Sequence, residues 1–194
     1  MGKYEVTQAE WEGVLGTNPS FFQGEALPDG VDSANLPVEQ VSWADVVEFT
    51  ALSGLSLPSE AQWEYACRGG SGAAFAGNGV LADMGWYVEN SEGRPHTVGT
   101  RLPNAFGLFD LHGNLYEWCS DVYNEGFYST GEAAELDPVF RGEGEYRVVR
   151  GGGWFYEPAS CRSGNRYAIS SRVKGNRRLG LRVAISLQEP VNGL

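Results

Sequence analysis

The spacing of apolar positions along the chain changes near residue 70. Before that point, apolar side chains recur at helical intervals behind residues that can cap a helix, as Val46 and Phe49 do behind Ser42. After it, no helical period persists, and short apolar runs alternate with glycine, proline and asparagine turns. This pattern predicts an α+β fold with its helices early in the chain and irregular strands late.

Three helices are predicted from the signals at their ends. In each, a Thr or Ser hydroxyl can accept a hydrogen bond from the first turn, and glycine follows the last helical residues. Two of them carry a capping box, in which Glu10 or Gln62 can accept a hydrogen bond from the capping residue in return. The predicted helices begin after Thr7, Ser42 and Ser59 and end near Gly13–Gly16, at Leu52 and before Gly69–Gly70.

Short extended segments are predicted later in the chain, between clusters of turn residues. No internal repeat, low-complexity tract or linker interrupts the sequence, so residues 1–194 are expected to form one domain. The extended segments are Met84–Val88, His96–Gly99, Arg147–Arg150 and Leu181–Ile185.

The composition favours a loop-rich fold held by aromatic packing, because the chain has 27 glycines, 6 tryptophans and 9 tyrosines. Its net charge of −11 argues against binding to nucleic acid or to anionic membranes. No apolar run approaches the length of a transmembrane helix, so direct membrane insertion is not expected. The sequence leaves the cellular location open.

The charge is distributed unevenly along the chain. Residues 162–182 hold seven of the fourteen Lys and Arg side chains and no acid, so the remaining 173 residues carry −18 against the segment's +7. A basic segment on an acidic protein can form an interaction face. The alternative is that its arginines pair with carboxylates inside the fold.

Seven motifs occur in an order that resembles the sulfatase-modifying-factor domain of the formylglycine-generating enzyme family. The likeness covers nearly the whole chain. It implies a variant of the C-type lectin fold, which is rich in loops and has little regular secondary structure. The motifs are Met1–Gln8, Asn35–Trp43, Leu57–Ala66, Pro103–Asp110, Gly113–Trp118, Arg150–Trp154 and Leu179–Val183.

The best-known members of this family oxidise a cysteine of a sulfatase to formylglycine, using copper held by two cysteine thiolates. The resemblance places those two positions at Tyr156 and Cys161. One cysteine cannot supply the two-sulfur site that Cu(I) favours, so we expect no copper and no enzymatic activity. Cys161 is then either a small buried side chain or a disulfide partner of Cys67 or Cys119.

A non-catalytic branch of the family includes the variable proteins of diversity-generating retroelements, which display a hypervariable ligand-binding surface on the C-terminal part of the fold. The resemblance assigns framework roles to Arg150–Trp154, Cys161–Arg166 and Leu179–Val183. It leaves the residues between them as candidates for the ligand-binding surface. These candidates are Phe155, Tyr156, Glu157, Ala159, Ser160, Tyr167, Ala168, Ile169, Ser170, Arg172, Lys174, Asn176 and Arg177.

The function expected from the sequence is therefore binding of a protein or other macromolecular ligand through residues 155–178. Exposed aromatics beside arginines are typical of binding hot spots, and the positive charge favours an acidic patch on the ligand. The main alternative is a formylglycine-generating-type oxidase with an altered site, or a catalytic domain separated from its partner. A carbohydrate lectin and a structural subunit of an assembly are further alternatives.

One metal site is expected from the resemblance. Asn114 and Glu117 stand where family members hold a structural calcium ion, and amide and carboxylate oxygens are ligands that suit Ca²⁺. The alternative is that both side chains form hydrogen bonds in a turn and a strand, with no ion.

Overall fold

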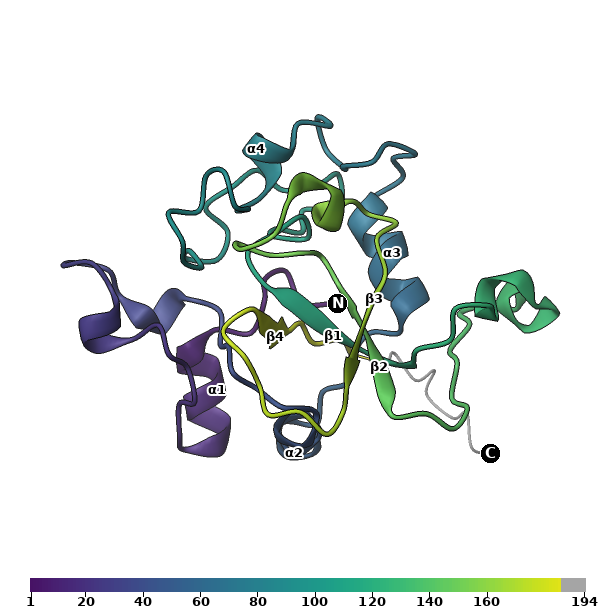
Figure 1. Ribbon diagram of the computed structural model, residues 1–194, viewed down its shortest axis with the longest axis horizontal. Coiled ribbons are helices and arrows are strands. Elements are labelled where there is room, and N and C mark those ends of the chain that lie inside the picture. Colours follow the sequence, from purple (N-terminus) through teal and green to yellow (C-terminus); the bar gives the residue numbers. More distant parts are fainter. Residues whose placement is uncertain (186–194) are drawn as a thin grey trace, which may run out of the picture.

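The computed structural model describes residues 1–185, and residues 186–194 of the expected domain lie outside the described part. At its centre is a four-stranded sheet in the order β3-β2-β1-β4 (Figure 1). Strands β1 and β4 are parallel, and the other two pairs are antiparallel. The strands are β1 (Tyr116–Val122), β2 (Tyr146–Arg150), β3 (Tyr167–Ser170) and β4 (Leu179–Leu181).

The three predicted helices are confirmed. Each begins at its expected capping residue, and the helix after Ser42 also has a capping box, with Asp45, that was not predicted. In the first helix, for example, Glu10 N donates to Thr7 Oγ1 at 3.2 Å and Thr7 N donates to Glu10 Oε2 at 2.8 Å. Each ends at a glycine in the left-handed conformation, which residues with a Cβ rarely adopt. The helices are α1 (Gln8–Leu15), α2 (Trp43–Ser53), α3 (Glu60–Arg68) and a short α4 (Leu81–Met84), with 3₁₀ turns η1 (Gly24–Ala26), η2 (Ser33–Asn35), η3 (Phe127–Ser129), η4 (Gly131–Ala134) and η5 (Pro158–Cys161).

The predicted strands are confirmed only in part. Arg147–Arg150 is confirmed as part of β2, whereas Leu181–Ile185 contributes only Leu181 to β4, before a single bridge between Ala184 and Ser56. The strand predictions for Met84–Val88 and His96–Gly99 are wrong, because neither segment pairs with a strand. The backbone polar groups of these two segments form hydrogen bonds with residues outside the sheet instead. Asn114 N donates to Trp86 O, and His96 N donates to Asn114 Oδ1.

Aromatic side chains fill the main core beside the sheet, as the composition predicts. Trp118 on β1 is fully buried, and Trp43 packs edge-on against it with ring centroids 5.5 Å apart. The rings of Trp11 on α1 and Phe49 on α2 stack face to face at 4.8 Å. These contacts join the two helices to the sheet. Along residues 1–185, no helix is both long and apolar enough to cross a bilayer.

Two arginines are fully buried and connect segments that are distant in sequence. Arg182 pairs with Glu117 at 2.8 Å and also donates to the carbonyl oxygens of Gly2 and Phe109. Arg150 donates to Ser163 O at 2.9 Å and pairs with Glu64. Buried charge is tolerated here because each guanidinium has several acceptors, which offset the loss of water.

Candidate ligand-binding surface

The candidate surface begins where β2 ends, at three consecutive glycines. Gly152 adopts a φ of 77°, and a Cβ on it would lie 2.6 Å from Cys161 Sγ, so only glycine fits this turn. Trp154 follows, with 7% of its surface exposed, and its ring packs edge-on against Phe22. Its indole N–H donates to Arg177 O at 2.9 Å, so this buried ring holds both ends of the segment in place.

Residues 155–178 divide into inward and outward positions. Of the expected framework, Cys161 and Ser163 are fully buried, whereas Arg162 and Gly164 are exposed. The candidate ligand-binding residues are all exposed or half-buried, with Phe155 47% and Tyr167 53% exposed. The segment therefore has an inner side of buried residues and an outer side whose side chains face solvent.

Part of this outer side forms a hollow of about 650 Å³, which we call the arginine hollow. Two guanidinium groups stand beside it, each resting on an aromatic ring: Arg178 lies 3.5 Å from the ring centroid of Phe155, and Arg177 lies 3.2 Å from that of Phe21. In the described part of the chain neither arginine forms an ion pair with an acid. The hollow is lined by Trp154, Phe155, Tyr156, Asn176, Arg177 and Arg178.

The loop that carries these arginines is fastened to the segment before α2. Gln40 N donates to Asn176 O at 3.0 Å, and the Gln40 side chain donates to Pro19 O. A Cβ on Gly175 would lie 2.0 Å from Gln40 C, so the two backbones touch at this point. Gly175 is therefore a framework position inside the variable-looking stretch.

A buried carboxylate, that of Glu39, holds the segment that carries Phe21. Glu39 is fully buried, and its Oε1 accepts hydrogen bonds from the backbone N–H groups of Phe21 and Phe22, while Oε2 has no partner in the described structure. Burial raises the pKa of Glu39 to about 7, and the positive charge of Arg177 counteracts part of that rise. The protonation of Glu39 is thus linked to the loop that supports Phe21.

The candidate residues that do not line the hollow lie beside it on the same segment. Tyr167 packs on the buried ring of Tyr116 with a centroid distance of 5.7 Å, and Tyr156, which lines the hollow, packs on the same ring at 4.9 Å. Arg172 pairs with Glu145 at 3.4 Å, which neutralises part of its charge. The remaining candidates lie on β3 (Ala168, Ile169, Ser170), at or beside η5 (Glu157, Ala159, Ser160) and on the turn after β3 (Lys174).

Both alternatives for the basic segment, residues 162–182, hold in part: some of its cations pair with carboxylates inside the fold, and others remain available for an interaction face. Arg166 pairs with Glu60, Arg172 with Glu145 and Arg182 with Glu117, whereas the other four cations form no ion pair among the described residues. The predicted surface of residues 155–178 includes Arg178 but not Phe21 or Trp154. The basic stretch that ends at Arg178 indicated a role for this arginine. Nothing in the sequence near Phe21 links that residue to a segment more than a hundred residues later.

The two copper positions implied by the resemblance hold no thiolate pair. Tyr156 packs edge-on against Tyr116, and Cys161 is fully buried. Burial raises the pKa of the Cys161 thiol to about 11, so the thiol is protonated at neutral pH. All three cysteines are buried and free, which decides against a disulfide between Cys161 and either Cys67 or Cys119.

Asn114 and Glu117 do not fit a shared calcium ion. The Glu117 carboxylate accepts hydrogen bonds from Trp63 Nε1 at 2.6 Å and from the Arg182 guanidinium, whose positive charge stands where a cation would bind. The Asn114 side chain instead donates to Glu5 Oε2 at 2.6 Å and accepts from His96 N. Within residues 1–185, no group of three or more acids, histidines or cysteines is arranged to hold a metal.

Residues 1–187 match the family described as the sulfatase-modifying factor enzyme 1-like domain. The chain is 35% identical over 177 residues to a formylglycine-generating enzyme of Streptomyces coelicolor, covering 84% of this chain and 54% of that protein. It is 32% identical over 158 residues to one from Thermomonospora curvata, covering 73% of this chain and 51% of that protein. The chain therefore spans about half the length of these curated relatives.

Two solved structures share this fold over most of the chain. Treponema denticola variable protein 1 superposes with a TM-score of 0.79 at 28% identity, over 92% of this chain and 81% of that chain. PvdO from Pseudomonas aeruginosa gives a TM-score of 0.74 at 27% identity, over 93% of this chain and 77% of that chain. These likenesses confirm the loop-rich C-type-lectin-like fold that the motifs imply.

We expect the chain's melting temperature to be the same in millimolar Ca²⁺ and in chelator. The reason is that Arg182 already neutralises Glu117, so no calcium ligands remain free there. Thermal unfolding followed by circular dichroism measures this. A melting temperature that rises with Ca²⁺ in the wild type but not in Glu117→Gln would support a calcium site, because an ion that binds only the folded state stabilises that state.

We also expect a pH-dependent difference in stability between the wild type and Glu39→Gln. The folded-state pKa of Glu39, about 7, exceeds its unfolded value, so the stability it contributes is complete below about pH 4 and is lost as pH rises through 7. Urea unfolding from pH 5 to 8 should show the wild type losing free energy of unfolding relative to Glu39→Gln. Parallel pH profiles for the two proteins would show that Glu39 is ionised throughout.

Proposed function

The chain belongs to the sulfatase-modifying factor enzyme 1-like domain family, and we propose that it is a non-catalytic ligand-binding member of that family. Its ligand-binding side chains are those of residues 155–178, displayed on a framework that does not change with them. The likeness to Treponema denticola variable protein 1 supports this proposal.

The observation that carries the proposal is the separation of inner and outer positions in this segment. Trp154, Cys161 and Ser163 are buried and anchor the backbone, while the candidate residues between them face outward. Because outward side chains contribute little to the core, they can differ without disturbing the fold. A surface with these properties suits recognition of different ligands by one backbone.

The ligand we propose is a protein or other macromolecule with an acidic patch. Arg177 and Arg178 lie beside the arginine hollow without an acidic partner in the described structure, and their guanidinium groups rest on Phe21 and Phe155. Cations already stacked on rings lose little freedom when they bind, and such Arg–aromatic groups are common binding hot spots. An acidic side chain that enters the hollow would meet both guanidinium groups.

The second candidate function is that of a formylglycine-generating-type oxidase, which the 35% identity to the Streptomyces coelicolor enzyme favours. Against it stand Tyr156 at one thiolate position and the protonated, buried thiol of Cys161 at the other. The absence of a thiolate pair leaves copper without its soft ligands.

We expect the framework and the display surface to respond differently to truncation. Trp154→Ala and Leu181→Ala should each lower the free energy of unfolding by about 2–5 kcal/mol, because they remove large buried side chains. Phe155→Ala and Tyr167→Ala should change it by about 0.5–1 kcal/mol at most, because roughly half of each ring is exposed. Urea unfolding measures both. If substitutions throughout 155–178 unfold the protein as readily as Trp154→Ala does, the segment is core and the proposal fails.

Ligand binding should depend on the arginine hollow rather than on positive charge in general. Macromolecules captured by the immobilised wild-type chain should be lost with Arg177→Ala/Arg178→Ala, because the hollow then lacks both guanidinium groups. Lys3→Ala/Arg141→Ala removes the same charge at exposed positions outside residues 155–178 and outside the hollow, and should retain them. Equal loss with both double variants would indicate non-specific attraction.

We expect no conversion of a sulfatase cysteine peptide to formylglycine by the chain in the presence of copper and oxygen. Mass spectrometry of the incubated peptide is the measurement, with a formylglycine-generating enzyme as the positive control. Loss of sulfur with aldehyde formation would overturn the non-catalytic proposal and favour the oxidase.

A further inference from the structure

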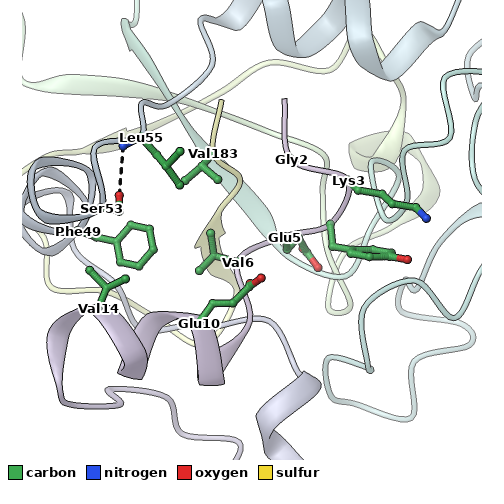
Figure 2. A pocket seen from close by; sticks show the side chains of 11 residues that line it. Gly2, Lys3, Glu5, Val6, Glu10, Val14, Phe49, Ser53, Leu55 and Val183 are labelled. Carbon is green, nitrogen blue, oxygen red and sulfur yellow. Dashed lines mark hydrogen bonds between the residues drawn. The ribbon is translucent and has the colours of Figure 1, made fainter. Parts of the chain in front are cut away.

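A second cavity, of about 460 Å³, lies where the first residues of the chain pass α1 and the end of α2 (Figure 2). It shares no lining residue with the arginine hollow. Its volume falls within the range of small-molecule pockets, about 300–1,000 Å³. We call it the N-terminal cavity.

The walls of the N-terminal cavity are apolar. The side chains of Val6, Val14, Phe49, Leu55 and Val183 gather around it from three parts of the chain: α1 and the residues before it, α2 and the residues after it, and the residues after β4 (Figure 2). The ring of Phe49 is held rigidly, because it stacks on Trp11 with an angle of 1° between the ring planes. These walls suit an apolar ligand body and exclude water from it.

One carboxylate of the cavity lining, that of Glu10, has no ionic partner among residues 1–185. Its Oε2 caps α1 by accepting from Thr7 N and Thr7 Oγ1, but in the described part of the chain Glu10 forms no ion pair. Lys3 does not neutralise it: its side chain points away from the apolar walls, and its ammonium lies 5.3 Å from the ring centroids of both Tyr4 and Phe109 (Figure 2).

Two other polar side chains of the lining, Glu5 and Ser53, are already hydrogen-bonded. Glu5 accepts hydrogen bonds from Asn114 Nδ2 and Leu115 N and is fully buried. Ser53 Oγ accepts from Leu55 N at 3.3 Å. The N-terminal cavity therefore offers a ligand an apolar interior and the carboxylate of Glu10, while the Lys3 ammonium of the same lining lies beside the rings of Tyr4 and Phe109.

We propose that the N-terminal cavity binds a small hydrophobic amine. The apolar body of the amine lies among Val6, Phe49 and Leu55, and its ammonium group pairs with Glu10. The negative charge of the protein outside residues 162–182 further favours a cation over an anion at this site. Its ligand is thus opposite in charge to that of the arginine hollow, and the two sites are independent.

The test uses 4-phenylbutylamine as the probe, with 4-phenylbutanol as a neutral analogue of similar shape and 4-phenylbutyrate as an anionic one. Titration followed by calorimetry and by backbone amide NMR shifts should show the amine binding at Val6, Val14 and Leu55. The alcohol should bind there about fivefold more weakly, which is the upper range for a solvent-exposed ion pair, and the acid more weakly still.

Glu10→Gln removes the negative charge while keeping the fold. Glutamine also completes a capping box, so α1 keeps its first turn while the carboxylate charge is lost. The affinity for the amine should fall about fivefold, to that of the alcohol, and the affinity for the alcohol should not change. Glu12→Gln is the matched control, because it removes the same charge from α1 at a position outside the cavity lining, and it should leave both affinities unchanged.

Val14→Trp tests whether the cavity itself is the site. The larger side chain occupies the space beside Phe49 and should abolish binding of amine and alcohol, with the helical circular dichroism retained. Three results would each overturn the proposal: no binding of the amine, equal amine affinity in wild type and Glu10→Gln, or amine binding that survives in folded Val14→Trp.

Discussion

The guanidinium of Arg182, buried beside β1 and β4, joins four parts of the chain that lie far apart in sequence. It pairs with Glu117 and donates to the carbonyl oxygens of Gly2 and Phe109. Few regular hydrogen-bond ladders are available in so loop-rich a fold, so much of the buried backbone must find its partners through side chains. Glu117 also accepts from Trp63, which extends the same network to α3. Loss of either partner would leave an uncompensated buried charge, which makes this pair a constraint on the whole fold.

The rigidity of this framework is what allows the outer surface to be free. Arg150 fixes the inner side of the C-terminal segment by donating to Ser163 O, and Trp154 fixes its later part by donating to Arg177 O. Both donors come from the buried end of β2 and the residues after it. Backbone position along residues 155–178 therefore depends on a few buried contacts rather than on the side chains that face outward. A binding surface can change under such conditions without loss of stability.

Local signals predicted what depends on neighbours in sequence, and failed where distant residues decide the outcome. The three helices followed from capping boxes such as Thr7 with Glu10 because both partners lie within one turn. The segment His96–Gly99 has the composition of a strand, but Asn114 and Asp110 side chains take up its N–H groups. For Glu117 the resemblance supplied a calcium site, whereas the partner that occupies it, Arg182, stands 65 residues later. The framework and outward positions followed from the motifs, but their gathering into the arginine hollow required Phe21 and the fold.

The charge of the whole protein would limit which acidic ligands suit the site proposed at the arginine hollow. Outside residues 162–182 the chain carries −18, so a ligand with acidity spread over a wide surface would be repelled by the rest of the protein. Arg177 and Arg178 attract only over short distances, since salt screens charges beyond about 8–10 Å. A ligand of the proposed site would therefore have to present its acid as a compact group and fill the remaining hollow with apolar surface against Trp154 and Phe155. The same argument disfavours nucleic acid, whose charge extends along its whole length.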